Sequence, residues 1–344
     1  METKTDIKSL NFDELSQYIE SIGEKNFRAK QLYEWMHIHL ARDYESMTNI
    51  SKDLRSMLSQ NTEYTSLKIA DMLKSAIDGT RKYLFKLSDG NCVESVLMRY
   101  KHGISVCISS QVGCKMGCRF CASTIDGWVR NLTPAEMLDQ IYSISYDTGE
   151  RVSNVVVMGT GEPLDNYDNL VKFIRMLTDE HGLNISERNV TVSTCGLIPK
   201  INDLAKEDLN ITLALSLHAS TQAKRVKIMP IANTYEITDV VRAIKDYERA
   251  TGRRITYEYT LIKGVNDTDE DADELIRLLG TKSVHINLIP VNPINERKYK
   301  ASSKSSVLKF KKKLEKNAIN VTIRREMGRD IDGACGQLRR KHIN

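Results

Sequence analysis

The sequence predicts an α/β protein whose main body is a complete or partial (β/α) barrel of about six strand–helix repeats. From residue 106 onward, short apolar runs alternate with segments of helical periodicity, which is typical of parallel strands joined by helical crossovers. Polar or glycine-rich clusters also follow successive predicted strands, and a barrel gathers such strand ends at one face. Before residue 75 helical periodicity dominates, which predicts a small N-terminal helical accessory domain.

The N-terminal domain, residues 1–75, contains three predicted helices and no metal-binding or catalytic cluster. The first is indicated by apolar residues at helical spacing, Leu15, Tyr18, Ile19 and Ile22. The second and third are expected near residues 27–36 and 51–58. This domain is either an RNA-docking unit or a plain scaffold.

Residues 76–105 predict a β-hairpin extension of the barrel. Two strand-like runs, 83–87 and 93–98, flank Asp89-Gly90, which is a strong hairpin signal. Glu94 lies in the second run and by pattern alone resembles a surface strand residue. The ribbon leads into a further strand at residues 106–109, directly before a cysteine-rich loop.

The barrel core is assigned to residues 106–328, followed by a C-terminal segment at 329–344. Its strands are expected at 106–109, 154–158, 189–193, 210–217, 255–262, 284–289 and 321–325. Its first helix is expected to begin at residue 134. Five further helices are expected at 168–177, 198–204, 237–251, 269–279 and 307–314. The first of these helices has a clear start signal, because Thr133 and Glu136 form a capping-box pattern around Pro134.

Composition and charge limit the class of protein. The 344 residues are 41% hydrophobic, and no window is long and apolar enough for a membrane span. The N-terminus lacks an apolar signal region, so a soluble, cytoplasmic protein without a membrane partner is expected. The net charge is +5, but residues 301–344 hold 12 Lys/Arg against four Asp/Glu. This excess indicates a polyanionic partner, or merely a solvated basic helix face at 309–316.

Cys114, Cys118 and Cys121 form a C-x3-C-x2-C motif, and Gly113 and Gly117 provide the backbone freedom of a tight loop. Seven cysteines in such a chain favour metal binding or catalysis over disulfides. A structural zinc site or an ordinary electron-transfer cluster uses four ligands, whereas three leave one iron of a [4Fe–4S] cluster open. The spacing resembles that of the radical-SAM superfamily, in which the open iron binds S-adenosylmethionine (SAM). The alternatives are a zinc knuckle with a distant fourth ligand and three incidental cysteines.

Four later strand ends carry clusters suited to SAM, at residues 159–163, 193–196, 216–218 and 290–293. Gly161 lets a ligand approach the backbone closely, and Glu162 offers a carboxylate to the ammonium group of SAM. Hydroxyl and amide groups for the carboxylate and ribose of SAM come from Ser193, Ser216 and Asn292. His218 is either a structural histidine or a ligand contact.

Two cysteines outside the motif are candidates for chemistry. Cys335 lies between two glycines, after Arg324, Arg325 and Arg329, and cationic neighbours make a thiol more reactive. It is therefore a candidate nucleophile. Cys107 lies on the strand that enters the cysteine loop.

Several segments together resemble the RlmN/Cfr family of radical-SAM adenine methyltransferases acting on ribosomal RNA: Cys107–Cys121, Met158–Leu164, Ser216–His218, Met229–Ile231 and Asp330–Leu338. The resemblance implies a radical-SAM partial (β/α)6 barrel and one [4Fe–4S] cluster on Cys114, Cys118 and Cys121. It also implies two SAM molecules per turnover, one as methyl donor and one as radical source. The SAM-contact positions of the family fall on Gly161, Glu162, Ser193, Ser216, Leu217, His218 and Asn292.

The resemblance also implies three catalytic roles. Cys335 carries the methyl group as an S-methylcysteine intermediate, Glu94 accepts the adenine ring proton, and Cys107 forms a transient disulfide with Cys335. The expected product is 2-methyladenosine, in the peptidyl-transferase centre of 23S rRNA and 3′ of the anticodon in tRNA. The basic C-terminal segment is then expected to contact RNA phosphates. The expected electron donor is a flavodoxin- or ferredoxin-like protein.

Three other functions compete with this interpretation. A Cfr-type enzyme methylates C8 of the same rRNA adenine and confers antibiotic resistance. A non-catalytic RNA-binding protein would hold a structural metal at the three cysteines. A radical-SAM enzyme for a small molecule or peptide would leave the basic segment and the Cys107/Cys335 pair unexplained.

Overall fold

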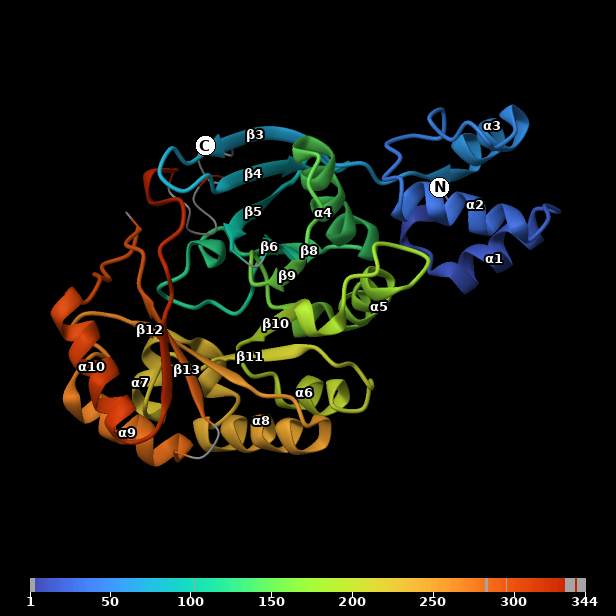
Figure 1. Ribbon diagram of the computed structural model, residues 1–344. Coiled ribbons are helices and arrows are strands. Elements are labelled where there is room, and N and C mark those ends of the chain that lie inside the picture. The colour runs from blue at the N-terminus through green and yellow to red at the C-terminus, as the bar shows by residue number, and fades with distance from the viewer. Residues whose placement is uncertain (1–3, 102, 282–283, 295, 332–337, 339–344) are drawn as a thin grey trace.

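The computed structural model describes residues 4–331 and 338, apart from residues 102, 282–283 and 295, and is built around one ten-stranded sheet (Figure 1). The strands from β14 to β6 in the sheet order run parallel, whereas β5, β4 and β3 continue the sheet antiparallel at one end. In sheet order they are β14 (Asn320–Ile323), β13 (His285–Pro290), β12 (Thr256–Leu261), β11 (Thr212–Ser216), β10 (Val190–Thr194), β9 (Asn154–Val157), β6 (Gly103–Ile108), β5 (Cys92–Tyr100), β4 (Arg81–Lys86) and β3 (Lys68–Lys74).

Helices connect consecutive parallel strands and cover the outer face of the sheet, where neighbouring helices pack on one another (Figure 1). They are α4 (Pro134–Thr148), α5 (Tyr167–Thr178), α6 (Ile198–Leu204), α8 (Ile237–Thr251), α9 (Asp269–Leu279) and α10 (Lys304–Lys316). The main core lies between these helices and the sheet, and includes Val155, Val192 and Leu213. In the described chain, β14 and β3 are the two edge strands of the sheet, so the barrel is not closed. The predicted partial (β/α)6 barrel is thereby confirmed.

Most predicted elements agree with the structure within a few residues. Helix α4 begins with the predicted capping box, in which the Thr133 hydroxyl accepts a hydrogen bond from the Glu136 amide and the Glu136 carboxylate accepts one from the Thr133 amide. Strand β3 was not predicted and lies inside the range expected to be helical. Its side chains are mostly exposed, so no buried alternation marks it in the sequence. Its pairing with β4 makes it a strand and gives the predicted hairpin a third strand.

The N-terminal helices α1 (Phe12–Ser21), α2 (Phe27–His37) and α3 (Lys52–Asn61) enclose a small core of their own. A buried network attaches this unit to α4. Asp139 on α4 forms ion pairs with Lys8 and Arg42 and accepts a hydrogen bond from the Leu67 backbone. Such a buried, hydrogen-bonded carboxylate accepts only one arrangement of its partners. The helical unit is therefore held in a defined position beside the barrel (Figure 1).

In the described part of the chain, no helix has the length and apolar character needed to cross a bilayer.

Candidate active site

The three cysteines of the C-x3-C-x2-C motif lie on a loop closed by two short antiparallel strands, β7 (Gln111–Gly113) and β8 (Trp128–Asn131). Gly113 has φ +75°, and a Cβ atom there would lie 1.9 Å from the Gly127 carbonyl oxygen. Only glycine fits this close approach. The Cys114 amide donates to the same oxygen at 3.0 Å, so the first cysteine is held at the base of the loop.

The three thiols lie close enough to influence one another in an apolar setting. Burial raises the pKa of Cys114 to about 12, and Cys121 adds to this effect. Burial also raises the pKa of Cys118, with Cys121 and Cys114 as further causes. In the described residues no three His, Cys, Asp or Glu side chains converge on a single ion. A [4Fe–4S] cluster does not require this, because each cysteine bonds a different iron, and metal binding replaces the thiol protons. The donor set therefore fits such a cluster.

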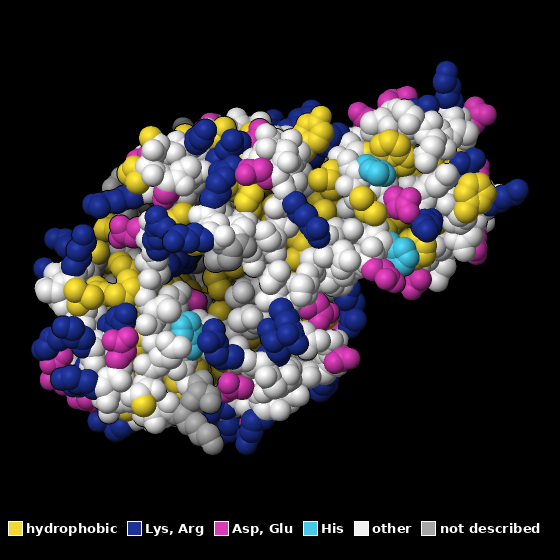
Figure 2. All heavy atoms as spheres, in the orientation of Figure 1, with side chains coloured by type: hydrophobic (Ala, Val, Ile, Leu, Met, Phe, Trp, Pro, Cys, Tyr) yellow, Lys and Arg dark blue, Asp and Glu magenta, His cyan; other side chains and the backbone are white. Residues whose placement is uncertain are grey.

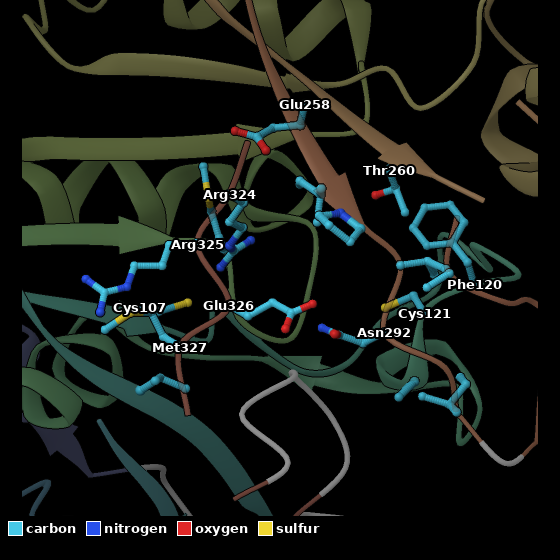
Figure 3. A pocket seen from close by; sticks show the side chains of 18 of the residues that line it. Cys107, Phe120, Cys121, Glu258, Thr260, Asn292, Arg324, Arg325, Glu326 and Met327 are labelled. Atoms are coloured by element: carbon cyan, nitrogen blue, oxygen red, sulfur yellow. The ribbon is translucent and has the colours of Figure 1, made fainter. Parts of the chain in front are cut away.

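A cavity of about 560 Å³ lies beside the loop, at the C-terminal ends of the parallel strands. Figure 3 shows Cys121 and Asn292 on one side of it and Cys107 toward the other. Figure 2 shows a hollow in the larger body with Lys and Arg side chains around it. A barrel places its ligands at this end, because the loops after parallel strands meet there.

Six of the predicted site residues line this one cavity, although they come from separate segments: Cys107, Cys121, Ser193, Ser216, His218 and Asn292. Gly161, Glu162 and Leu217 are not among its lining residues. Glu162 is buried, and its carboxylate accepts hydrogen bonds from the amides of Cys195 (2.8 Å) and Leu164 (3.2 Å). Burial raises the pKa of this carboxyl group. Leu217 is buried in the core, and its amide donates to the Glu258 carbonyl.

Cys335 lies outside the described residues, but the segment before it does not. Residues 324–329 follow β14 and line the cavity. Gly328 then donates to Asp78 (3.0 Å), and Asp330 accepts from Ser75 (2.6 Å), both in the turn between β3 and β4. The segment thus runs from one end of the strand order to the other, across the mouth of the partial barrel (Figure 1).

Glu94 is buried, contrary to its surface-like pattern, and its carboxylate forms an ion pair with Lys82 on β4 at 3.2 Å. Val96, two residues further along β5, lines the cavity and pairs with Cys107 on β6. Side chains two apart on a strand share a face. Glu94 therefore faces the same side of the sheet as Val96, next to the cavity wall.

His218 is held in place by contacts with neighbouring residues and also lines the cavity. It has φ +55°, its Nδ1 accepts a hydrogen bond from the Thr260 amide at 3.0 Å, and its ring meets Phe120 edge-on. Burial, with a smaller contribution from the positive Arg225, lowers the pKa of His218 to about 3. The imidazole is therefore neutral, with its proton on Nε2, and still lines the cavity.

Two buried ionisable residues of the site were missed in the sequence. Glu258 on β12 lines the cavity, and the Asn287 amide donates to it at 3.1 Å. Burial raises the pKa of its carboxyl group, and the charge of Arg324 works in the opposite direction. The signal available in the sequence was a glutamate between two tyrosines inside a predicted strand. Arg225 lies on α7 (Gln222–Ile228), a helix that was not predicted.

Gly161→Ala is expected to weaken SAM binding about tenfold or more, or about 1.4 kcal/mol. Gly161 has φ +114°, and an added Cβ would lie 2.7 Å from the Gln111 Cβ atom. Gln111 in turn accepts from the Glu162 amide, so the carboxylate-bearing turn would shift. Calorimetric titration of the reconstituted protein with SAM measures the effect. Gly252→Ala is the control, since it has φ +66° and open space around it. Equal losses in both variants would contradict the expectation.

The three-cysteine loop and the cavity at the strand ends define the class of protein. The chain belongs to the radical SAM superfamily, whose family model matches residues 108–279. A crystal structure of a radical SAM methyltransferase from Sphaerobacter thermophilus is 39% identical, with a TM-score of 0.93 over 97% of this chain and 98% of the other. Membership implies a [4Fe–4S] cluster and SAM as cofactors.

Within this class the chain belongs to the RlmN family. A model described as the ribosomal RNA large subunit methyltransferase N-terminal domain matches residues 5–63. A relative from Lachnospira eligens is 62% identical over 98% of this chain and 97% of its own length. One from Lachnoclostridium phytofermentans is 60% identical over 99% and 96%. Both carry the name "probable dual-specificity RNA methyltransferase RlmN". The suspected family is thereby confirmed.

Proposed function

We propose that this chain is a radical SAM RNA methyltransferase that methylates C2 of an adenine in 23S rRNA and in tRNA. Relatives of 60% identity or more over nearly the whole chain bear a dual-specificity RNA methyltransferase name, which supports the class of reaction. The observation that carries the proposal is the shared cavity. Cys107 and Cys121 both line it, and so do residues 324–329, which lead toward Cys335.

The cofactors are assigned to the residues that fit them. Cys114, Cys118 and Cys121 would hold the [4Fe–4S] cluster. The predicted SAM contacts would come from side chains in the cavity wall and from the turn behind it: Gly161, Glu162, Ser193, Ser216, Leu217, His218 and Asn292. A reduced [4Fe–4S] cluster with SAM bound would supply the 5′-deoxyadenosyl radical, which can remove hydrogen from an unactivated methyl group.

The chain's own residues would transfer the methyl group. Cys335 takes a methyl group from a first SAM, so that two SAM molecules are used per turnover. Its S-methyl carbon, once hydrogen has been removed, bonds to C2 of the adenine, and Glu94 accepts the proton that C2 loses. Cys107 then loses its thiol proton and bonds to the sulfur of Cys335, while the bond between that sulfur and the methylene carbon breaks. The carbon takes up a proton to become the methyl group of the released RNA, and the one unpaired electron passes to the oxidised form of the electron-transfer protein. Reduction of the disulfide by an external donor restores both thiols.

The charge around the cavity suits an RNA substrate. Arg324, Arg325 and Arg329 are exposed and line the cavity, where they would neutralise phosphates. A cavity at the end of a barrel accepts a base only after it leaves its stack. We assign the N-terminal unit, fixed to α4 through Asp139, as a further docking surface for folded RNA. A flavodoxin- or ferredoxin-like protein would deliver the electrons.

Nucleoside mass spectrometry tests the proposal directly. Ribosomal RNA and tRNA are separated from a deletion strain, with and without the gene supplied again. We expect 2-methyladenosine to return in both RNA fractions, and not to return with a Cys118→Ala variant that cannot hold the cluster. Recovery of 8-methyladenosine without 2-methyladenosine would instead identify the Cfr-type reaction. Return in only one fraction would limit the substrate to that RNA.

A further inference from the structure

Arg225 is a fully buried cation on α7, and the last residue of this helix, Ile228, accepts a hydrogen bond from the Arg119 amide of the cysteine loop at 2.8 Å. Its Nη2 donates to the carbonyl oxygen of Cys195 at 2.6 Å, and its Nε donates to that of Leu217 at 3.2 Å. These contacts tie together the ends of β10 and β11. Uncharged donors would satisfy the same carbonyl groups, so the hydrogen bonds alone do not explain why a guanidinium is buried here.

The positive charge of Arg225 lacks a carboxylate partner in the described part of the chain. Its Nη1 atom is buried and has no hydrogen-bond partner among those residues. Cys195, whose carbonyl oxygen accepts from Arg225, belongs to the same buried apolar cluster as Cys114, and Cys118 packs against that cluster. The thiols of Cys195 and Cys118 are therefore near the Arg225 charge and favour it. Burying a guanidinium without a counter-charge is costly, so an anion is expected beside it in the working protein.

Cys118 provides the link between this cation and the cluster loop. Thiolates give the cluster site net negative charge, and each electron added makes it more negative. A buried cation nearby favours that added charge, because the low dielectric of the interior strengthens the attraction. Water screens exposed cations of the same loop, such as Arg119, so they have less influence.

We propose that Arg225 is the buried counter-cation of the [4Fe–4S] cluster and raises its reduction potential, so that one-electron reduction becomes easier. The inference rests on the proposed function, which places the cluster on Cys118 and its two neighbours. Arg225 acts through the cluster and is a positioning residue. Glu162, the other buried charge near Cys118 and Cys195, is left to pair with the ammonium group of SAM.

Redox titration of the reconstituted holoenzyme tests this, with the reduced cluster followed by electron paramagnetic resonance in the absence of SAM. Arg225→Gln keeps a donor for the carbonyl groups but removes the charge. We expect its equilibrium constant for one-electron reduction to fall about tenfold or more, which is a potential about 59 mV lower. Arg225→Lys keeps the charge and is expected to shift by less than half as much. Lys227→Met, an exposed cation on the same helix, is the control and should match the wild type.

Each outcome separates the inference from the proposed function. A low potential, or loss of the cluster, in the Gln variant alone supports the charge role. Reduction potentials equal to that of the wild type in both variants would overturn the charge role. The same potential shift, or the same loss of cluster, in Arg225→Gln and Arg225→Lys would also overturn it, because the Lys variant retains the charge. A Gln variant with normal potential but weakened SAM binding would assign Arg225 to the SAM carboxylate instead. Absence of a [4Fe–4S] signal from the wild type would contradict the proposed function itself.

Discussion

Cys107→Ala is expected to accumulate protein covalently joined to its RNA, with product formation reduced to at most a single turnover. In the proposed mechanism, Cys107 supplies the sulfur that displaces the bridging carbon from Cys335. Without it the bond between Cys335 and the adenine has no intramolecular means of cleavage. Denaturing gels of anaerobic reactions with labelled RNA, followed by mass spectrometry after nuclease digestion, measure the adduct.

Companion variants separate this chemistry from general damage. Cys335→Ala should give neither product nor adduct, and the double variant should behave in the same way, because the bond to RNA cannot form. Cys92→Ala serves as the matched control, since Cys92 is half-buried at the start of β5 and does not line the cavity. Normal turnover by Cys107→Ala would refute its assigned role. An adduct in Cys335→Ala would place the methyl group on another residue.

Glu94→Gln is expected to reduce methylation by about 10²–10⁴-fold, the usual contribution of a positioned general base. Glutamine preserves the size of the side chain and can still contact Lys82, but it cannot accept the proton. Single-turnover assays that count 2-methyladenosine per enzyme measure the loss. SAM binding should stay unchanged, because Glu94 is not among the predicted SAM contacts.

Glu258→Gln gives the comparison that decides which carboxylate is the base. Glu258 lines the cavity directly, whereas Glu94 lies beside the wall in an ion pair with Lys82. If Glu94 is the base, the Glu258 variant should lose less activity than the Glu94 variant. A large loss in Glu258→Gln with near-normal turnover in Glu94→Gln would transfer the role to Glu258.

Local signals in the sequence predicted much of the barrel. The capping box at Thr133, the apolar run of β9 and the helix at 269–279 each depend on residues a few positions apart. Such signals can be recognised in a short segment alone, because a helix start has characteristic capping residues and a buried strand has a continuous apolar run. The polar clusters at the strand ends were predictable for the same reason, since each cluster directly follows its strand.

Other features left no local signal. Strand β3 exposes most of its side chains and takes its conformation from β4, so its sequence carries no strand alternation. Glu94 resembled a surface residue, because its partner Lys82 lies on the neighbouring strand. Arg225 resembled any other basic residue of a helix, although it is fully buried near Cys118.

The sequence by itself determined the class of chemistry, because the spacing of Cys114, Cys118 and Cys121 and the motif around Cys335 are properties of short segments. Only the tertiary structure decided which residues share the cavity and which charges are buried beside the cluster loop. It brings Cys107, Cys121 and residues 324–329 together, and it carries the chain from β14 across to the turn after β3. Contacts between distant segments depend on how the whole sheet closes, and no short stretch of sequence contains that information.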